Sequence, residues 1–249
     1  MAQIWRLIDS DLIDGPTSQA KDEAIHEARL KELVPNTLHL YRRKPPAVSI
    51  GRFQKIEDVV DVAFCREQGI DIIRRMSGGG TIYTDSNCLE YSVVVDQGHP
   101  KIPNDLEGSF RVMCTGIITA LKKLGIDSYY KPVNDVLVVG RKISGSAQRR
   151  RHILLQHGTL LLDTDLESMS KTIKIGNKGV AKLKEKLTTI RWEAKRPISV
   201  KEVSEALETG FEEILSMKLL KGKLTHWEEI KIKELAEKYR SNSWVFSSH

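Results

Sequence analysis

RRMSGGGTIYTD, residues 74–85, lies between the apolar run at residues 70–73 and the strand-like run LEYSVVV at residues 89–95. Three consecutive glycines between two strands offer no side chains to pack and lose more backbone entropy than alanine would. They favour a bulge, a positive φ, or the close approach of a ligand to bare N–H groups. Arg74 and Arg75 add guanidinium groups, whose planar forks suit carboxylate or phosphate. The stretch predicts an anion cradle, with an ordinary hairpin turn and two solvated arginines as the structural alternative.

The glycine-rich stretch fits neither of two common nucleotide-binding loops. A Walker A loop ends in Lys-Ser or Lys-Thr, which is missing here, and a G-x-G-x-x-G fingerprint opens a helix. Residues with strand propensity follow the glycines instead. The phosphate-loop and Rossmann interpretations are therefore excluded.

The composition indicates a globular protein. A chain of 249 residues can form one large domain with a sizeable core. No apolar run approaches the roughly 20 residues that span a bilayer, and the N-terminus lacks the layout of a signal peptide. Three widely spaced cysteines, Cys65, Cys88 and Cys114, predict reduced and mostly buried thiols and no zinc site or disulfide framework. These features predict a cytoplasmic protein without a membrane partner.

The charge balance favours an acidic partner. Lys and Arg number 39 against 33 Asp and Glu, which gives a net charge of +6. Such a charge suits nucleic acid, a nucleotide or an acidic protein surface. Aromatic content is only 6%, and no run interleaves basic with aromatic residues as a base-stacking platform would. We therefore predict no nucleic-acid partner.

Periodicity and turn residues divide the chain into helices and short strands. Helices are predicted at residues 17–34, 57–68, 105–124 and 225–239, with another helical region from Pro197. Strands are predicted at residues 37–42, 47–51, 128–131, 135–139, 143–147, 153–156 and 159–162. The Lys-rich interval at residues 174–188 predicts a mobile basic loop with at most short helical pieces, and a solvated surface segment is the alternative.

NDVLVVGRKISGSA, residues 134–147, predicts a hairpin that turns at Gly140-Arg141. Lys142 then enters the return strand, where pairing holds its backbone and makes the ammonium a positioned point charge. A lone lysine at a hairpin end more commonly extends into solvent, which is the alternative. The small residues Ser144 to Ala147 leave space beside Lys142, and this favours a site.

Taken together, these stretches resemble the lipoate-protein ligase family. The matching segments are residues 74–80 with Asp85, the Asn134-Asp135 pair, residues 142–147, and HGTLLLD at residues 157–163. Weaker similarities are GRFQ at residues 51–54, Arg191 and Trp244. Thr84 departs from the pattern, because the family commonly has His there, and the C-terminal accessory domain of many bacterial ligases is missing.

The resemblance implies an α+β (mixed α/β) fold, with largely antiparallel mixed sheets flanked by helices. This fold is similar to biotin ligases and to the catalytic domains of class II aminoacyl-tRNA synthetases. It implies one catalytic domain over residues 1–249, with a helical C-terminal segment at about residues 197–249.

The resemblance also implies a two-step activity. Lipoate and ATP give lipoyl-AMP and pyrophosphate, with Mg²⁺ as the metal, and the lipoyl group then passes to a lysine of an acceptor protein. The implied acceptors are lipoyl domains, such as the E2 subunit of 2-oxoacid dehydrogenases, the H protein of glycine cleavage, or similar proteins. The missing domain implies a separately encoded accessory protein as a further partner.

The resemblance also implies roles for individual residues at the positions that match the motifs of the lipoate-protein ligase family. Lys142 is the implied catalytic residue, because a point charge can stabilise the phosphate and carbonyl oxygens in turn. The implied ATP and lipoyl-AMP site comprises Arg75, Gly78, Gly79, Gly80, Thr81, Ile82, Tyr83, Asn134, Asp135 and Lys142, with Asp135 as a Mg²⁺ ligand. The implied lipoyl tunnel comprises Gly79, Ser146, Ala147, His157, Gly158 and Thr159. A further hypothesis is that the basic loop at residues 178–186 closes over the adenylate and meets the acceptor.

Two other functions stay open. An octanoyl or lipoyl transferase would use a cysteine thioester and no ATP, and needs an activated thiolate in the pocket. Cys65 and Cys114 fall on predicted helices, and only Cys88 lies near Asp85. The other alternative is a non-catalytic sensor of lipoate or biotin. A biotin ligase is disfavoured, because the glycine-rich stretch and the Lys142 segment follow the lipoate branch.

Overall fold

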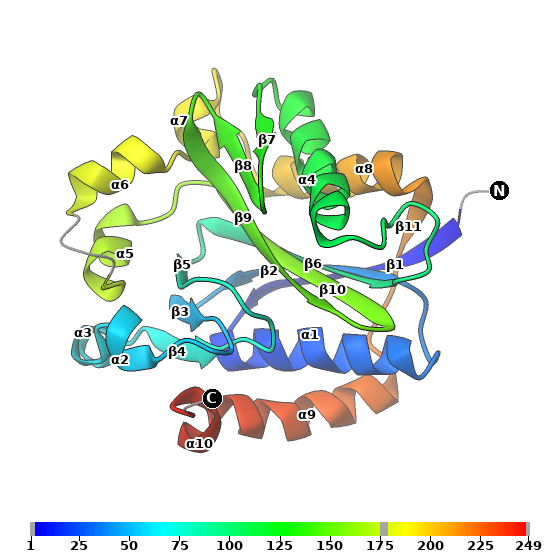
Figure 1. The fold of residues 1–249 in the computed structure, drawn as a ribbon, viewed down its shortest axis with the longest axis horizontal. Coiled ribbons are helices and arrows are strands. Elements are labelled where there is room, and N and C mark those ends of the chain that lie inside the picture. Colours follow the sequence, from blue (N-terminus) through cyan, green and yellow to red (C-terminus); the bar gives the residue numbers. More distant parts are fainter. Residues whose placement is uncertain (1–2, 175–178, 248–249) are drawn as a thin grey trace.

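A large mixed sheet forms the centre of the protein (Figure 1). The computed structural model describes residues 3–174 and 179–247. In spatial order the strands are β11 (Met217–Lys221), β1 (Gln3–Ile13), β2 (Thr37–Arg43), β6 (Cys88–Asp96), β10 (Ile153–Leu161), β9 (Arg141–Arg150), β8 (Asp135–Val138) and β7 (Tyr129–Lys131). β1 is parallel to both of its neighbours, and all other pairs are antiparallel.

A small sheet carries the glycine-rich stretch. Its order is β4 (Asp71–Arg74), β3 (Ala47–Ile50) and β5 (Ile82–Thr84), with β3 parallel to β4 and antiparallel to β5. The three glycines lie in the connection from β4 to β5, which must cross β3 to reach its other edge. The glycines therefore stand where the chain passes over the ends of strands.

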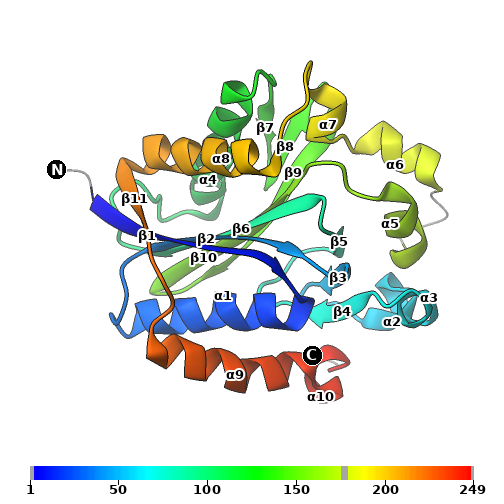
Figure 2. The same cartoon turned by 180° about the vertical axis from the view of Figure 1, so that it is seen from behind.

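Two pairs of long helices cover the large sheet, one pair on each face (Figures 1 and 2). α1 (Gly15–Leu30) and α9 (His226–Arg240) lie on one face, and α4 (Leu106–Lys123) and α8 (Val200–Leu215) lie on the other. The remaining helices are short: α2 (Ile56–Val59), α3 (Val62–Glu67), α5 (Leu166–Thr172), α6 (Val180–Lys186), α7 (Ile190–Glu193) and α10 (Asn242–Val245). Among the described residues, no helix is long and apolar enough to cross a membrane.

The core follows from this layering. β10 is buried along its whole length, and β6 is buried up to its last residue, because helices cover both faces of the sheet. α4 begins at Asp105, whose carboxylate accepts the Gly108 N–H, and its apolar side packs on the sheet. α4 and α8 approach closely at Gly116 and Gly210, where an added Cβ on Gly210 would collide with the carbonyl oxygen of Gly116.

Most sequence predictions agree with the fold. The single helix predicted at residues 57–68 is instead the two short helices α2 and α3, because Val60 between them is extended and forms a bridge with Ile173. The α+β class with flanking helices is confirmed, and so are the helices at residues 17–34 and 105–124 within a few residues of their ends. β1 and β11 were missed, so the C-terminal segment is not wholly helical. The two strands predicted at residues 153–156 and 159–162 are the single strand β10, because Gln156 and His157 are buried in the sheet and do not form a turn.

The Lys-rich interval is only partly described. It includes α6, a short helix, in agreement with the prediction of at most short helical pieces. Residues 175–178 lie outside the described part, so the predicted loop at residues 178–186 can be followed only from residue 179. The hairpin turn before Lys142 consists of Val139 and Gly140, both with positive φ, and not of Gly140-Arg141 as predicted.

Candidate active site

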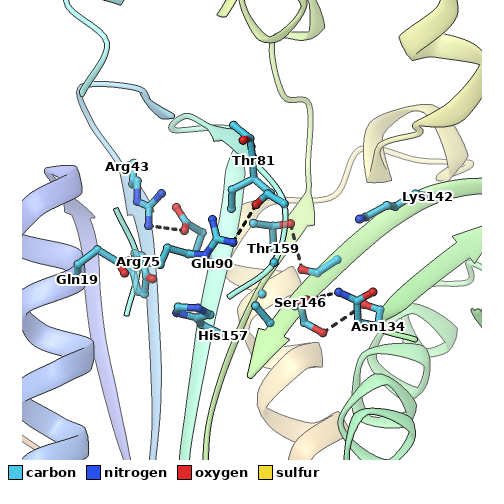
Figure 3. A pocket seen from close by; sticks show the side chains of 17 residues that line it. Gln19, Arg43, Arg75, Thr81, Glu90, Asn134, Lys142, Ser146, His157 and Thr159 are labelled. Atoms are coloured by element: carbon cyan, nitrogen blue, oxygen red, sulfur yellow. Dashed lines mark hydrogen bonds and ion pairs between the residues drawn. The ribbon is translucent and has the colours of Figure 1, made fainter. Parts of the chain in front are cut away.

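A pocket crosses the middle of the large sheet beneath the glycine-rich stretch (Figure 3). Paired residues on five adjacent strands form a row under it: Tyr41, Glu90, Thr159, Gly145 and Asp135. Asp135, beside Lys142, is about a quarter exposed, whereas Tyr41 and Glu90 are buried. The pocket therefore has an open end at Lys142 and a closed end near β2 and β6.

At the open end, Lys142 is held by its neighbours. Its ammonium lies 2.7 Å from an oxygen of Asp135, and both side chains are partly exposed. Cε and Nζ of Lys142 lie directly over Gly145, where an added Cβ would displace them from this position. The Lys142 carbonyl accepts the Thr188 N–H at 3.0 Å, which anchors the segment after α6 beside the open end.

Asn134 fixes one wall of the pocket. Its Nδ2 donates to the Ser146 carbonyl at 2.5 Å, and the Ser146 N–H donates to the Asn134 carbonyl at 3.2 Å. The backbone and the amide side chain together tie the start of β8 to β9. In this structure Asn134 thus supports the wall, and its predicted neighbour Asp135 contacts Lys142.

The two arginines of the glycine-rich stretch are buried and bonded to backbone. Arg75 donates to the carbonyls of Ser49, Gly78 and Gly80 at 2.8, 3.0 and 2.8 Å. Arg74 donates to the carbonyls of Arg52 and Gln54, both at 2.8 Å. Burial, together with a nearby arginine, lowers the pKa of Arg75 to about 10.

The alternative of two solvated arginines is therefore wrong, and much of the predicted cradle is already filled by carbonyl oxygens. Gly79 has a φ of +99°, and its carbonyl oxygen lies where a Cβ on Gly51 would be. The arginines and glycines together bend this segment over the pocket.

Charged and polar groups that the sequence did not predict surround the closed end. The guanidinium of Arg43 lies 2.9 Å from a carboxylate oxygen of Glu90, and both side chains are almost fully buried. Arg43 also donates to the hydroxyl of Thr84 at 3.0 Å, the position where the family commonly has His. Burial raises the pKa of Glu90 to about 7, although Arg43 opposes the shift. Gln19 of α1 completes this end.

His157 lines the pocket between its two ends. Its Nε2 lies 2.5 Å from Ser77 Oγ, and its Nδ1 lies 3.4 Å from Asp22 Oδ2. Burial lowers the pKa of His157, so the imidazole is neutral at pH 7. Burial alone would raise the pKa of Asp22, but hydrogen bonds from His157 and His39 hold it far below its usual range. The ring is thus fixed from both sides and forms a rigid wall.

The structure brings most of the predicted site residues to this one pocket. Those that line it are Arg75, Gly79, Gly80, Thr81, Ile82, Asn134, Lys142, Ser146, Ala147, His157, Gly158 and Thr159. Gly78 and Asp135 lie beside the lining, and Tyr83 packs in a hydrophobic cluster around β3 and α3. The one sequence signal for the closed end was Glu90, a single charge inside an apolar run.

The comparison with a protein-family model decides the family. The Lipoyl protein ligase A/B catalytic domain matches residues 14–212. The chain belongs to this lipoyl protein ligase A/B family. It is 32% identical to the octanoyltransferase LipM of Geobacillus kaustophilus, over 98% of each chain. It is 30% identical to the octanoyltransferase LipM of Staphylococcus aureus, over 99% of each chain.

Solved structures of lipoate protein ligases support the fold. A bi-partite lipoate protein ligase from Thermoplasma acidophilum, described with its E2 lipoyl domain, matches with a TM-score of 0.87 and 30% identity over 99% of this chain and 98% of that one. A lipoate-protein ligase A bound with ATP matches with a TM-score of 0.87 and 28% identity over 100% of both chains.

The expected ATP-dependent ligase activity is wrong, and so is the expectation of ATP and Mg²⁺ as cofactors. The curated relatives that match over almost the whole chain are octanoyltransferases, which favours the transferase alternative. The resemblance to the family is confirmed, and so is the prediction of an enzyme of protein lipoylation. The sequence could not separate the two activities, because the same glycines, lysine and small residues can enclose an acyl chain with or without a nucleotide.

Proposed function

We propose that this chain is an octanoyltransferase that acts without ATP. It moves the acyl group from a thioester donor to the ε-amine of a lysine on a lipoyl-domain acceptor. The observation that carries the proposal is its similarity, over almost the whole chain, to curated octanoyltransferases. The pocket is consistent with it, because a polar open end at Lys142 leads into an enclosed interior.

The donor class follows from the chemistry. An amide cannot form from a free carboxylate and an amine without activation, so a transferase that uses no ATP needs an acyl group that is already activated. In a thioester the acceptor amine attacks the carbonyl carbon, a C–N bond forms, the C–S bond breaks, and the thiol leaves with a proton. Lys142 provides positive charge at the open end, where the carbonyl oxygen becomes negative during this attack.

We infer that the acyl group passes directly from donor to acceptor. The cysteine relay of the transferase alternative needs a reactive thiolate, but Cys65, Cys88 and Cys114 are all buried and none lines the pocket. Cys114 lies behind the pocket wall, and burial raises the pKa of its thiol to about 12. A Cys114→Ser variant that keeps transfer would support direct attack, whereas an acylated cysteine found by mass spectrometry would refute it.

The proposed acceptor is a lipoyl domain that offers the ε-amine of a lysine. E2 subunits of 2-oxoacid dehydrogenases and the H protein of glycine cleavage, or similar proteins, fit this class, and a separate accessory protein stays a prediction. A cytoplasmic location also stays a prediction. The helix α6 places exposed lysines next to the segment that contacts Lys142, so an acidic acceptor surface fits this side of the open end.

The decisive experiment offers both chemistries to one protein. The purified chain is mixed with a lipoyl domain and either an octanoyl thioester of a carrier protein, or free octanoate with ATP and Mg²⁺. We expect the acceptor mass to increase by one octanoyl group with the thioester alone. Modification that needs the free acid and ATP, with release of pyrophosphate, would overturn the proposal.

A further inference from the structure

The closed end of the pocket is more polar than a plain alkyl chain requires. Gln19 is 1% exposed and lines the pocket, yet neither its amide nitrogen nor its amide oxygen has a hydrogen-bond partner among the described residues. One carboxylate oxygen of Glu90, a residue that is 3% exposed, is likewise without a partner in that part of the chain. Figure 3 shows both side chains at the end away from Lys142.

Unsatisfied polar atoms at this depth point to a ligand. A buried donor or acceptor without a partner costs about 1–3 kcal/mol, and most such groups in proteins are paired. Gln19 combines an unpaired donor with an unpaired acceptor, and Glu90 adds an acceptor. A hydroxyl group matches this set, because it donates one hydrogen bond and accepts others.

The distance to Lys142 suits the far end of a medium-length acyl chain. Glu90 pairs with Thr159, and Thr159 pairs with Gly145, which lies directly under the Lys142 side chain. Two steps between neighbouring strands correspond to about 10 Å. With its carbonyl at Lys142, an extended chain of octanoyl length would place its last carbon near Gln19 and Glu90.

We propose that Gln19 and Glu90 form a subsite that selects medium-length acyl groups with a hydroxyl at their distal end over plain alkyl chains. The proposal rests on the proposed acyl transfer and specifies its substrate class. A site that hydrogen-bonds a substrate hydroxyl discriminates strongly against the analogue without it, because the polar groups of the site then stay unpaired.

Competition between two donors tests the subsite. The purified protein and a lipoyl-domain acceptor are mixed with equal amounts of the octanoyl and 8-hydroxyoctanoyl thioesters of the same carrier. Mass spectrometry then resolves the two acylated forms of the acceptor. We expect a ratio of kcat/KM of about tenfold or more in favour of the hydroxylated chain. In Gln19→Leu we expect the ratio to fall below one. Gln156→Met serves as the matched control, because Gln156 is equally buried but bonded to Gln148 and does not line the pocket.

A binding measurement separates failure of this subsite from failure of acyl transfer. Calorimetric titration with free octanoate and free 8-hydroxyoctanoate needs no turnover, and thermal unfolding shows that each variant is folded. If neither thioester reacts but the hydroxylated acid binds more tightly and Gln19→Leu removes the difference, the subsite stands and the transfer proposal fails. Equal binding and equal transfer of both chains in the unmodified protein would overturn the subsite, with buried water satisfying Gln19 instead.

Discussion

The proposed role of Lys142 in acyl transfer depends on the position of its ammonium group as well as on its charge. Asp135 holds its ammonium at the open end, above Gly145, where the acceptor amine meets the carbonyl carbon in the proposed reaction. We expect Lys142→Ala to lower kcat by about 10²–10³, because one preorganised charge next to the developing oxyanion is lost. The measurement is kcat for transfer from the octanoyl thioester to the acceptor, compared between the variant and the unmodified chain.

The control for this prediction is Lys201→Ala, which removes an equally charged but exposed side chain on α8. Both variants should unfold at the same temperature as the unmodified chain, because Asp135 stays partly solvated without Lys142. A Lys142→Ala protein that is folded and transfers at a normal rate would remove Lys142 from the mechanism.

Glu90, at the closed end of the pocket, makes the stability of the fold depend on pH. Its folded pKa of about 7 lies above the ordinary value of 4.5, so between these values the folded state binds more protons than the unfolded state. The contribution of Glu90 to stability is therefore fully present below about pH 4.5 and falls as the pH rises towards 7. We expect the stability difference between the unmodified chain and Glu90→Gln to fall by about 3 kcal/mol over this window.

Urea unfolding of both proteins at pH 5 and at pH 7.5 measures this effect. All other titratable side chains are common to the two proteins, so the comparison isolates the effect of Glu90. Glu90→Gln also leaves the buried Arg43 without its charged partner, so only the pH dependence of the difference is diagnostic. A difference that is the same at both pH values would mean that Glu90 titrates normally.

At the scale of elements, two of the long helices that cover the large sheet are packed in close contact. α4 and α8 touch through Gly116 and Gly210, and an added methyl on Gly210 meets backbone that cannot move aside easily. We expect Gly210→Ala to destabilise the protein by about 1–3 kcal/mol, as overpacking does elsewhere. Gly179→Ala, which adds a methyl into open space, is the control in the same urea titration. Equal midpoints would show that the helices separate at little cost.

The elements also show what local sequence can and cannot predict. The glycine-rich stretch and the Lys142 hairpin were recognisable because their residues are neighbours in the chain. Gln19 and Glu90 meet only through the packing of α1 against β2 and β6, which no local pattern encodes. β1 was missed for a similar reason, since its partners begin at Thr37 and Met217 and its own ladder is irregular between Asp9 and Leu12.

At the scale of the whole molecule, the net charge of +6 acts on association with the acceptor. If the lysines of α6 attract an acidic lipoyl domain, Lys182→Glu with Lys186→Glu should raise KM for the acceptor several-fold and weaken its dependence on salt. Lys233→Glu on α9, on the opposite layer, should change neither. Identical salt dependence in all three proteins would exclude α6 from the acceptor surface.

The parallel pairing of β1 with β11 has a consequence for synthesis. Arg6 of β1 is buried against Glu228 of α9 at 2.6 Å, and Gln3 pairs with Met217. β1 therefore leaves the ribosome long before β11 and α9, so this edge of the strand is uncovered and Arg6 is unpaired until those elements have been synthesised. Contacts between residues this far apart in sequence form slowly. A nascent chain that pauses before residue 217 would therefore expose an unpaired strand edge, which can pair with other chains and is a target for chaperones.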